Sequence, residues 1–588
     1  MSDRILSLLA ALYGQPAADA AWARIRLHLE SFPKELLSRS GQACQLSEKD
    51  AILITYGDTF TCLGQPPLQT LAQFAGQWLE GAVSGLHILP FYPFSSDDGF
   101  SVIDYRQVDP RLGSWEDISN LGQRYRLMFD GVINHVSQHS AWFQAYLRQE
   151  APYRDYFITA NPDWDLSGVI RPRTLPLLTD FETEAGTRQV WTTFSADQID
   201  LNYANPRVLI EIIDLLLYYV QRGAGIIRLD AIAYLWKEPG TSCIHLPQTH
   251  LVIKILRAVL DWVAPHVILI SETNVPHREN ISYFGERNPA TGRIDEAQLV
   301  YQFPLAPLIL HSFAAQDASY LCEWTATLDA PGIFFNFIAS HDGIGVQPVR
   351  DLLTETEVRR LVERIQAHGG LISCKSDANG RQIPYELNIS LYDALNDPAH
   401  PDPHTDMHRF LAAQVIMLSL AGVPGIYVHS LFGSHNCLPC VQDSGRARSI
   451  NREKFDYTTL KTELEQGKSQ RANILAAYRR LLLIRRQQPA FHPEGAQKVL
   501  CCNPSIFSIA RFDPNQECPI VCMVNVSPTR SACHLDLRKQ RLPDYLNWQD
   551  LIAGEIYHPA NSCLEITLAP YQSCWLTPCS NHRNASTH

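Results

Sequence analysis

The sequence lacks the marks of several large classes of protein. No apolar run is long enough to span a bilayer, since Ile212–Val220 is short and Asp214 interrupts it. Asp3 precedes the apolar part of the N-terminus and no processing site follows, so we expect an amphipathic helix there rather than a signal peptide. Basic residues are in deficit, with a net charge of -12 and a pI of about 6.0. That balance favours neither a nucleic acid nor a membrane surface as partner.

Internal repeats and low-complexity tracts are also absent. Of the 588 residues, 46% are hydrophobic and 19% are charged, which excludes a mostly disordered chain. The length predicts several domains, or one large barrel with additions.

Paired cysteine motifs are scarce. The fifteen cysteines are odd in number, scattered and mostly set in apolar runs, which predicts reduced thiols in a cytoplasmic protein. Cys437 and Cys440 form the only Cys-x-x-Cys motif, and no second pair stands at zinc-site spacing. We therefore expect no metal site, and the role of these two cysteines stays open.

Continuous apolar strands alternate with helices through much of the chain. Strands are predicted at 51–56, 87–92, 127–133, 225–230, 267–271 and 333–338, and helices at 67–81, 205–222, 248–263 and 406–420. Uninterrupted apolar strands are typical of a parallel sheet covered on both faces. Their order over this length predicts an α/β fold, a (β/α)8 TIM barrel.

Other regions break this alternation. Short alternating strands at 505–512, 519–525 and 564–568 indicate a small all-β C-terminal domain. The predicted division is a helical N-terminal lead-in at 1–50, the barrel at 51–135, 204–342 and 396–487, an inserted domain at 136–203, a second insertion with mobile loops at 343–395, the β-domain at 488–579 and a tail at 580–588.

Charged residues gather where barrel strands should end. Arg228 and Asp230 stand two residues apart, so a strand places them on one face. The pair is either a structural ion pair or an arginine that orients a carboxylate nucleophile, and this segment alone does not separate the two. Other polar residues follow strands in the same way: Asp130, Asn134, His135, Glu272, His341 and Asp342. So many buried charges cost free energy unless they are paired or functional.

Two carboxyl groups that face one pocket are the catalytic groups that enzymes typically use to cleave a glycosidic bond. Asp230, beside Arg228, is predicted to have a lowered pKa and to act as nucleophile. Glu272 has no cation adjacent in sequence, so a raised pKa and general acid/base work are predicted for it. Asp342 would stabilise positive charge in the transition state, and His135 and His341 would hydrogen-bond the same sugar.

Four segments resemble the signature regions of the α-amylase superfamily, namely Asp130-Gly-Val-Ile-Asn-His135, Gly225-Ile-Ile-Arg-Leu-Asp230, Glu272-Thr-Asn and His341-Asp342. The finer similarity is to the sucrose phosphorylase branch, and it lies in 89–104, 191–200, 237–243 and 448–452. The resemblance covers about residues 50–490.

The resemblance implies that Asp230 is the nucleophile, Glu272 the general acid/base and Asp342 the transition-state stabiliser. It implies no metal or organic cofactor. In a retaining enzyme the two reacting carboxyl groups lie about 5–5.5 Å apart. The residues implied to bind the glucosyl unit are Asp97, Phe100, His135, Phe194, Gln198, Arg228, Tyr234, His341 and Arg448. For the two phenylalanines, core packing is the alternative.

A phosphorylase must admit a phosphate dianion. Arg171-Pro-Arg173 is a rigid basic element suited to phosphate, with a pair of surface arginines as the alternative. It resembles the phosphate-binding stretch of the branch, with Arg173 and Tyr385 in that role. Retention over two inversions gives α-D-glucose 1-phosphate.

The acceptor segments depart from sucrose phosphorylase proper and resemble the glucosylglycerate phosphorylase subgroup, whose acceptor is D-glycerate. Positive charge for that carboxylate would come from Lys237, His245, His435 and Arg446, and Glu386 would take its hydroxyl groups. A histidine at 435 departs from the arginine typical of the subgroup. The alternative interpretation of each of these residues is a solvated charge in a surface loop.

Several functions stay open beside a glucosylglycerate phosphorylase. Sucrose, sucrose 6′-phosphate and glucosylglycerol are alternative donors, and an α-glucoside hydrolase or transglucosidase of the same fold is a rival. A carbohydrate-binding relative without activity is disfavoured, since all three carboxylates are present. The partners expected are a small-molecule glucoside and phosphate, for a monomer or a homodimer.

Overall fold

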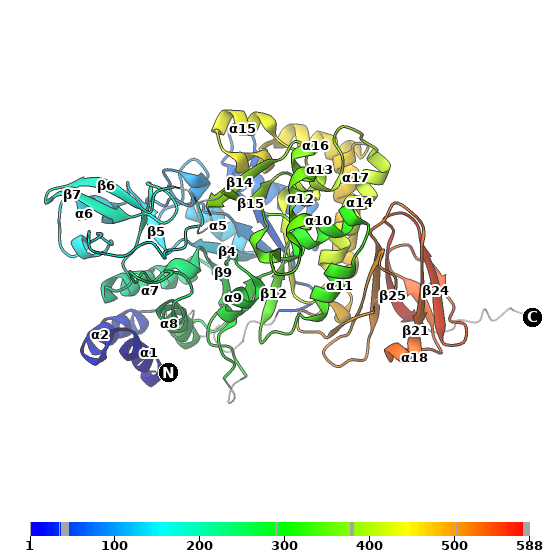
Figure 1. The fold of residues 1–588 in the computed structure, drawn as a ribbon, viewed down its shortest axis with the longest axis horizontal. Helices are drawn as coiled ribbons and strands as arrows, with labels where there is room; N and C mark the ends of the chain where they lie inside the picture. Colours follow the sequence, from blue (N-terminus) through cyan, green and yellow to red (C-terminus); the bar gives the residue numbers. More distant parts are fainter. Residues whose placement is uncertain are drawn as a thin grey trace, which may run out of the picture.

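A closed barrel of eight parallel strands forms the centre of the protein (Figure 1). The computed structural model describes residues 2–33, 36, 46–173, 175–288, 292–376, 382–500 and 502–579, so the predicted tail at 580–588 lies outside the described residues. Around the barrel the strands are β1 (Ile52–Thr55), β16 (Val423–Tyr427), β12 (Ile333–Asn336), β11 (Leu299–Tyr301), β10 (Ile268–Ser271), β9 (Ala224–Leu229), β4 (Arg126–Gly131) and β3 (Gly85–Ile88). This confirms the predicted (β/α)8 fold.

Helices follow the barrel strands and cover their outer faces, as the pattern of apolar runs predicts. They are α4 (Pro67–Trp78), α5 (Trp115–Gly122), α7 (Pro206–Gln221), α8 (Pro247–Val263), α9 (His277–Ile281), α10 (Leu305–Ala315), α11 (Ser319–Ala326), α14 (Pro403–Ser419), α16 (Tyr457–Gln466) and α17 (Gln470–Arg485). Local chemistry sets their starts. Asn205 caps α7 by accepting a hydrogen bond from the backbone of Arg207, ahead of a proline in the first turn.

Two barrel strands escaped the sequence prediction, and a third was misplaced. β16 contains Pro424 and Gly425, which count against a strand, yet a Cβ at Gly425 would lie 2.4 Å from the Phe335 ring, so close packing requires glycine there. β11 is only three residues long. The strand predicted at 87–92 is β3 at Gly85–Ile88, because Pro90 has no N–H for the strand ladder.

Smaller elements lie beside the barrel. At the N-terminus, α1 (Ser2–Tyr13) and α2 (Gln15–Glu30) form a hairpin that packs on α7 and α8 (Figure 1). Between β4 and α7 lie β5 (His135–Ser137), α6 (Ala141–Leu147), β6 (Leu178–Thr183), β7 (Gly186–Trp191) and β8 (Gln198–Asp200). Between β12 and α14 lie β13 (Ile344–Gly345), α12 (Glu355–Ala367), β14 (Leu371–Ser376), β15 (Gln382–Asn388) and α13 (Leu391–Leu395). The exact limits of these inserted domains stay a prediction.

The C-terminal part is all-β except for one short helix, α18 (Leu537–Gln540), and it contains the three predicted strands. A six-stranded sheet runs in the order β18 (Gln497–Val499), β19 (Ile506–Arg511), β20 (Ile520–Asn525), β25 (Ser573–Cys579), β22 (Asn547–Asp550) and β23 (Ile556–Tyr557). A second, two-stranded sheet pairs β21 (Ser531–Asp536) with β24 (Cys563–Leu568).

The prediction for the Cys-x-x-Cys motif needs a correction. Cys437 and Cys440 form a disulfide at the start of α15 (Leu438–Ser444), with their Cα atoms 5.3 Å apart. The prediction that the cysteines are reduced is therefore wrong for this pair. The helical turn brings two cysteines three residues apart within bridging distance.

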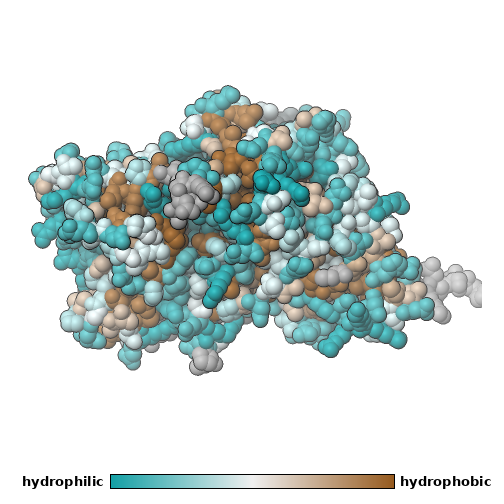
Figure 2. All heavy atoms as spheres, viewed as in Figure 1, coloured by the Kyte–Doolittle hydropathy of each residue, from teal (hydrophilic) through white to brown (hydrophobic). Residues whose placement is uncertain are grey.

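Hydrophilic residues cover most of the face shown in Figure 2, and apolar residues gather in its upper middle, where Figure 1 places α15. Within the described part of the chain, none of the helices combines the length and apolar character that a membrane crossing requires.

Candidate active site

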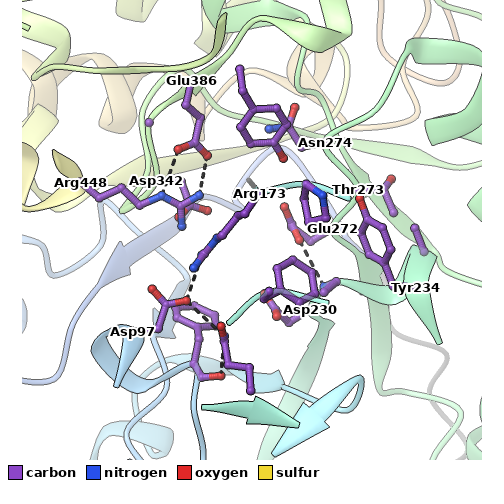
Figure 3. A pocket seen from close by; sticks show the side chains of 18 of the residues that line it. Asp97, Arg173, Asp230, Tyr234, Glu272, Thr273, Asn274, Asp342, Glu386 and Arg448 are labelled. Atoms are coloured by element: carbon purple, nitrogen blue, oxygen red, sulfur yellow. Dashed lines mark hydrogen bonds and ion pairs between the residues drawn. The ribbon is translucent and has the colours of Figure 1, made fainter. Parts of the chain in front are cut away.

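A cavity opens at the carboxyl ends of the barrel strands, and we call it the inner cavity (Figure 3). The predicted residues that line it are Asp97, Phe100, His135, Arg173, Phe194, Gln198, Asp230, Tyr234, Glu272, His341, Asp342, Tyr385, Glu386 and Arg448. Strand register brings the two central carboxylates together. Leu229 of β9 pairs with Ser271 of β10, and Asp230 and Glu272 are the next residues of each strand.

Arg228 lies behind the cavity wall and contacts both central carboxylates. One nitrogen, Nη1, donates to Asp230 at 2.8 Å and to Asp130 at 2.6 Å, and Nη2 lies 3.7 Å from Glu272. Asp130 also lies 2.8 Å from His87 Nε2. Arg228 is 1% exposed and does not line the inner cavity, so it acts there by orienting the carboxylates that it holds and by its field.

The pKa of Glu272 is shifted in the predicted direction, and that of Asp230 is shifted in the opposite one. Burial raises the pKa of Asp230, and the attraction of Arg228 only partly opposes that rise. The predicted lowering is therefore wrong, because desolvation at the end of a buried strand exceeds the effect of one guanidinium. Burial, with Asp230 and Asp342 nearby, raises the pKa of Glu272 to about 7, as predicted, although Arg228 opposes the rise.

Asp342 and Glu386 share one guanidinium on the opposite side of the cavity (Figure 3). Arg448, from the turn η8 (Ala447–Asn451), lies 2.6 Å from Asp342 and donates to both Glu386 oxygens, at 3.0 and 2.5 Å. Burial alone would raise the pKa of Asp342, but the guanidiniums of Arg448, Arg452 and Arg228 outweigh it and lower that pKa. Of Asp230, Glu272 and Asp342, only Asp342 has a lowered pKa, so it stays ionised at lower pH than the other two. Glu386, predicted to take acceptor hydroxyl groups, lines the cavity and accepts from Arg448, and its role toward the acceptor stays a prediction.

Asp97 accepts hydrogen bonds from one residue predicted for the glucosyl unit, Gln198, and from one predicted for phosphate, Arg173. Its Oδ2 accepts hydrogen bonds from Arg173 at 3.1 Å and from Gln198 at 3.2 Å. Burial opposes its ionisation, yet Arg173, Arg448 and Arg452 together lower its pKa. The loop that carries Asp97 is held by Asp197, which accepts from several serine hydroxyl groups of that loop.

Aromatic rings form the apolar walls of the inner cavity. Phe100 stacks on His341 with ring centroids 5.1 Å apart, and Phe194 meets the edge of Tyr234 at 5.4 Å. His135 donates its Nε2–H to the carbonyl of Phe100, 2.9 Å away, which places the ring proton on that nitrogen. Burial lowers the pKa of His135 and that of His341, the latter to about 3, so both imidazoles are neutral at pH 7.

Three residues predicted for the acceptor do not line the inner cavity. Lys237 Nζ is buried against Asp200 and Asn134, each at 2.7 Å. His245 Nδ1 lies 2.7 Å from the Tyr283 hydroxyl, and burial lowers its pKa to about 4, so it is uncharged at pH 7. His435 lies 2.6 Å from Asp393, in a separate small cavity. None of the three lines the inner cavity, and their roles as acceptor cations stay a prediction.

Other lining residues were not predicted, among them Pro172, Ala231, Ala233, Thr273, Asn274, Val275, Phe303 and Gly343. Asn274 had a signal, since it belongs to the segment that begins with Glu272. It packs against Gly345, where a Cβ would lie 2.5 Å from the Asn274 Oδ1. Phe303 follows β11, a strand that the sequence did not reveal, so no sequence signal pointed to it.

Within the described residues, no group of three or more histidine, cysteine, aspartate or glutamate side chains is arranged to hold a metal ion. The carboxylates of the cavity are instead paired with arginines. A (β/α)8 barrel with three carboxylates at its strand ends, one of them with a pKa near 7, is the architecture of a carbohydrate-active enzyme.

Comparison with known proteins agrees with this class. Residues 80–335 match the family model described as alpha amylase, catalytic domain. The chain is 46% identical over 587 residues to a glucosylglycerate phosphorylase of Spirochaeta thermophila, with 98% of each chain covered. It is 51% identical over 581 residues to a glucosylglycerate phosphorylase of Allomeiothermus silvanus, again with 98% of each chain covered.

A solved structure with the same fold is that of sucrose 6F-phosphate phosphorylase from Thermoanaerobacter thermosaccharolyticum. The TM-score is 0.70 at 24% identity, with 82% of this chain and 94% of that chain covered. The chain belongs to the α-amylase family and, within it, to the group formed by these phosphorylases.

Proposed function

We propose that this protein is a retaining glycoside phosphorylase, which transfers an α-glucosyl unit from a 2-O-α-glucosyl-D-glycerate-type donor to phosphate. The products are α-D-glucose 1-phosphate and D-glycerate. The observation that carries the proposal is the identity of 46% and 51%, over nearly the full length, to two glucosylglycerate phosphorylases. The three carboxylates that the chemistry needs line one cavity here.

In the first displacement, Glu272 acts as acid and Asp230 as nucleophile. Glu272, with a pKa of about 7, protonates the oxygen that leaves as glycerate. Asp230 attacks the anomeric carbon and forms a β-glucosyl ester, and Arg228 holds the attacking carboxylate in place. Asp342, kept ionised by Arg448, stabilises the positive charge of the oxocarbenium-like transition state.

In the second displacement, a phosphate oxygen attacks the same carbon and the ester bond to Asp230 breaks. Glu272, now a carboxylate, takes the proton that the attacking phosphate oxygen loses. Two inversions retain the configuration. Asp97, Gln198 and His135 would hold the glucosyl hydroxyl groups between the walls of Phe100, Phe194 and Tyr234.

The proposal includes inorganic phosphate as co-substrate, with no metal or organic cofactor in either step. It also includes a cytoplasmic location and a monomer or homodimer as the working unit. The carboxyl groups of Asp230 and Glu272 are expected about 5–5.5 Å apart, the separation of retaining enzymes.

The test is to incubate the enzyme with 2-O-α-D-glucosyl-D-glycerate, with and without phosphate, and to follow the products by NMR. We expect α-D-glucose 1-phosphate and glycerate only with phosphate. Glucose released equally fast without phosphate would mean a hydrolase. Parallel reactions with sucrose, sucrose 6′-phosphate and glucosylglycerol decide the donor, and a higher kcat/KM for one of these would overturn glycerate as the acceptor.

A further inference from the structure

The cations near the active site differ in how much of their hydrogen-bonding capacity is already used. Arg228 holds two carboxylates and approaches a third, and Arg448 holds Asp342 and both oxygens of Glu386. Arg452 pairs with Asp98 and donates to the carbonyl of His341. Each of these guanidiniums is thus committed to groups of the protein itself.

Arg173 is in a different position. It donates one hydrogen bond to Asp97, at 3.1 Å, and lies over the Phe194 ring at 5.9 Å. Its side chain is 29% exposed. Because a guanidinium carries five N–H donors in a planar fork, Arg173 can still bind a second anion with two parallel hydrogen bonds.

The place of Arg173 suits an incoming acceptor. A second cavity, which we call the outer cavity, shares Asp97, Pro172, Arg173, Tyr385, Glu386 and Arg448 with the inner cavity. Arg446 lines only the outer cavity of the two, is 41% exposed, and lies 3.5 Å from Asp98. In Figure 3 Arg173 extends toward Asp97 between the Glu272 side and the Arg448 side of the cavity.

In the proposed reaction, glycerate and phosphate both react at the same side of the glucosyl unit. Glycerate leaves, and phosphate attacks, at the same anomeric carbon and through the same acid/base, Glu272. Both are small anions. Of the residues that the sequence suggested for the glycerate carboxylate, Lys237 and His435 are paired with carboxylates and His245 is uncharged at pH 7. The fourth, Arg446, lines the outer cavity.

We propose that Arg173, with Arg446 at its outer edge, forms one anion-binding site that holds phosphate in one half-reaction and the acceptor carboxylate in the other. The inference rests on the proposed function and adds to it the residue that selects anionic acceptors. In both cases the group on Arg173 is the charged end of the acceptor. The attacking oxygen, of phosphate or of the glycerate 2-hydroxyl, loses its proton to Glu272 as the ester bond to Asp230 breaks.

The test uses α-D-glucosyl fluoride, a donor without phosphate or carboxylate. The glucosyl-enzyme then partitions between water and added phosphate or D-glycerate, and the product ratios report acceptor binding independently of the first step. In the wild-type enzyme phosphate and glycerate are expected to compete for one site. Arg173→Ala is expected to lower both ratios, phosphate over water and glycerate over water, by the same factor of at least tenfold.

Matched variants make the outcome specific. Arg173→Lys keeps the charge and loses the fork, so it should recover part of both ratios. Arg188→Ala removes an exposed arginine of β7, in the same inserted segment but outside both cavities, and should change neither. Arg446→Ala is the milder test should Arg173→Ala fold poorly, and a smaller, equal drop in both ratios is expected.

Two outcomes count against the inference in different ways. If Arg173→Ala lowers the phosphate ratio and leaves the glycerate ratio unchanged, the two anions have separate sites and the inference is overturned, while the proposed function stands. If the wild-type enzyme transfers glucose to phosphate but not to glycerate, the proposed acceptor is wrong and the shared site falls with it.

Discussion

The inner end of the active site and its outer end are built in different ways. The inner end takes Asp230 and Glu272 from the ends of adjacent barrel strands, whose register is set by backbone pairing. The outer end takes Arg173 and Tyr385 from two inserted segments, and Arg446 from the loop after α15. A rigid frame thus holds the reacting groups, while the proposed anion site is assembled from side chains of distant segments.

The two ends also differ in how charge is balanced. At the inner end each carboxylate contacts Arg228 or Arg448, whose guanidiniums are committed to groups of the protein, and burial together with these cations sets its ionisation state. At the outer end the arginines are partly exposed and keep donors for a ligand. A group that must react is thereby fixed by the protein, and a group that must exchange anions is left accessible.

The largest effect is expected at the nucleophile of the inner end. Asp230→Ala should lower glucosyl transfer by about 10⁴-fold or more, since no carboxylate remains to form the ester. Arg228 keeps Asp130 as a partner, so the fold should persist. Initial rates and a circular dichroism melt measure both, with Asp180→Ala, an exposed carboxylate of β6, as control. Undiminished transfer would refute the assignment of Asp230.

Lys237 tests whether a cation assigned to the acceptor is structural. Lys237→Met leaves the buried Asp200 carboxylate without its ion pair, so the free energy of unfolding should fall by about 3–5 kcal/mol. The ratio of transfer to phosphate and to glycerate should stay within twofold of wild type. Urea titration and the partition experiment measure the two quantities.

A double variant supplies the control for Lys237. Lys237→Met with Asp200→Asn removes both charges and should regain part of the lost stability. A stable Lys237→Met variant with an altered acceptor ratio would contradict the structural role and move Lys237 to the outer end.

Glu272 tests the electrostatics of the inner end through pH. Its pKa in the folded protein is about 7, against 4.5 for an ordinary glutamate, so the folded state binds the proton more tightly than the unfolded state. The associated stability is fully present below pH 4.5 and is lost as pH rises through 7. Glu272→Gln should therefore be more stable than wild type by up to roughly 3 kcal/mol at pH 8.5, with little difference at pH 4.

Unfolding titrations of both proteins at the two pH values measure this shift. A constant difference between them would show that the carboxyl does not titrate with a raised pKa. In the wild-type enzyme the kcat/KM for the donor should fall tenfold for each pH unit above about 7, because the acid form of Glu272 is needed first.

The smallest effect is expected at His245. His245→Phe removes the contact with the Tyr283 hydroxyl and should cost about 1 kcal/mol of stability, since no charge is lost at pH 7. The acceptor ratio should not change by more than twofold. A selective loss of transfer to glycerate, with phosphate unaffected, would return His245 to the acceptor site.

Prediction from sequence worked better for the inner end of the site than for the outer end. Arg228, Asp230, Glu272 and Asp342 were found because each lies in or shortly after an apolar run that predicts a barrel strand. Lys237, His245 and His435 were expected at the acceptor, yet none of them lines the inner cavity, because the position of a residue in the sequence does not reveal which group its side chain meets. The strand β16 was missed because it contains Pro424 and Gly425, and both residue types are uncommon inside strands.

The sequence by itself determined the barrel, six of its eight strands and the three carboxylates, since apolar periodicity and residue spacing are local properties of the chain. Only the tertiary structure decided the raised pKa of Asp230, the binding of Glu386 by Arg448 and the availability of Arg173. These depend on burial and on contacts between residues far apart in the chain. Desolvation and Coulomb energies follow distances in space, which spacing along the sequence does not contain.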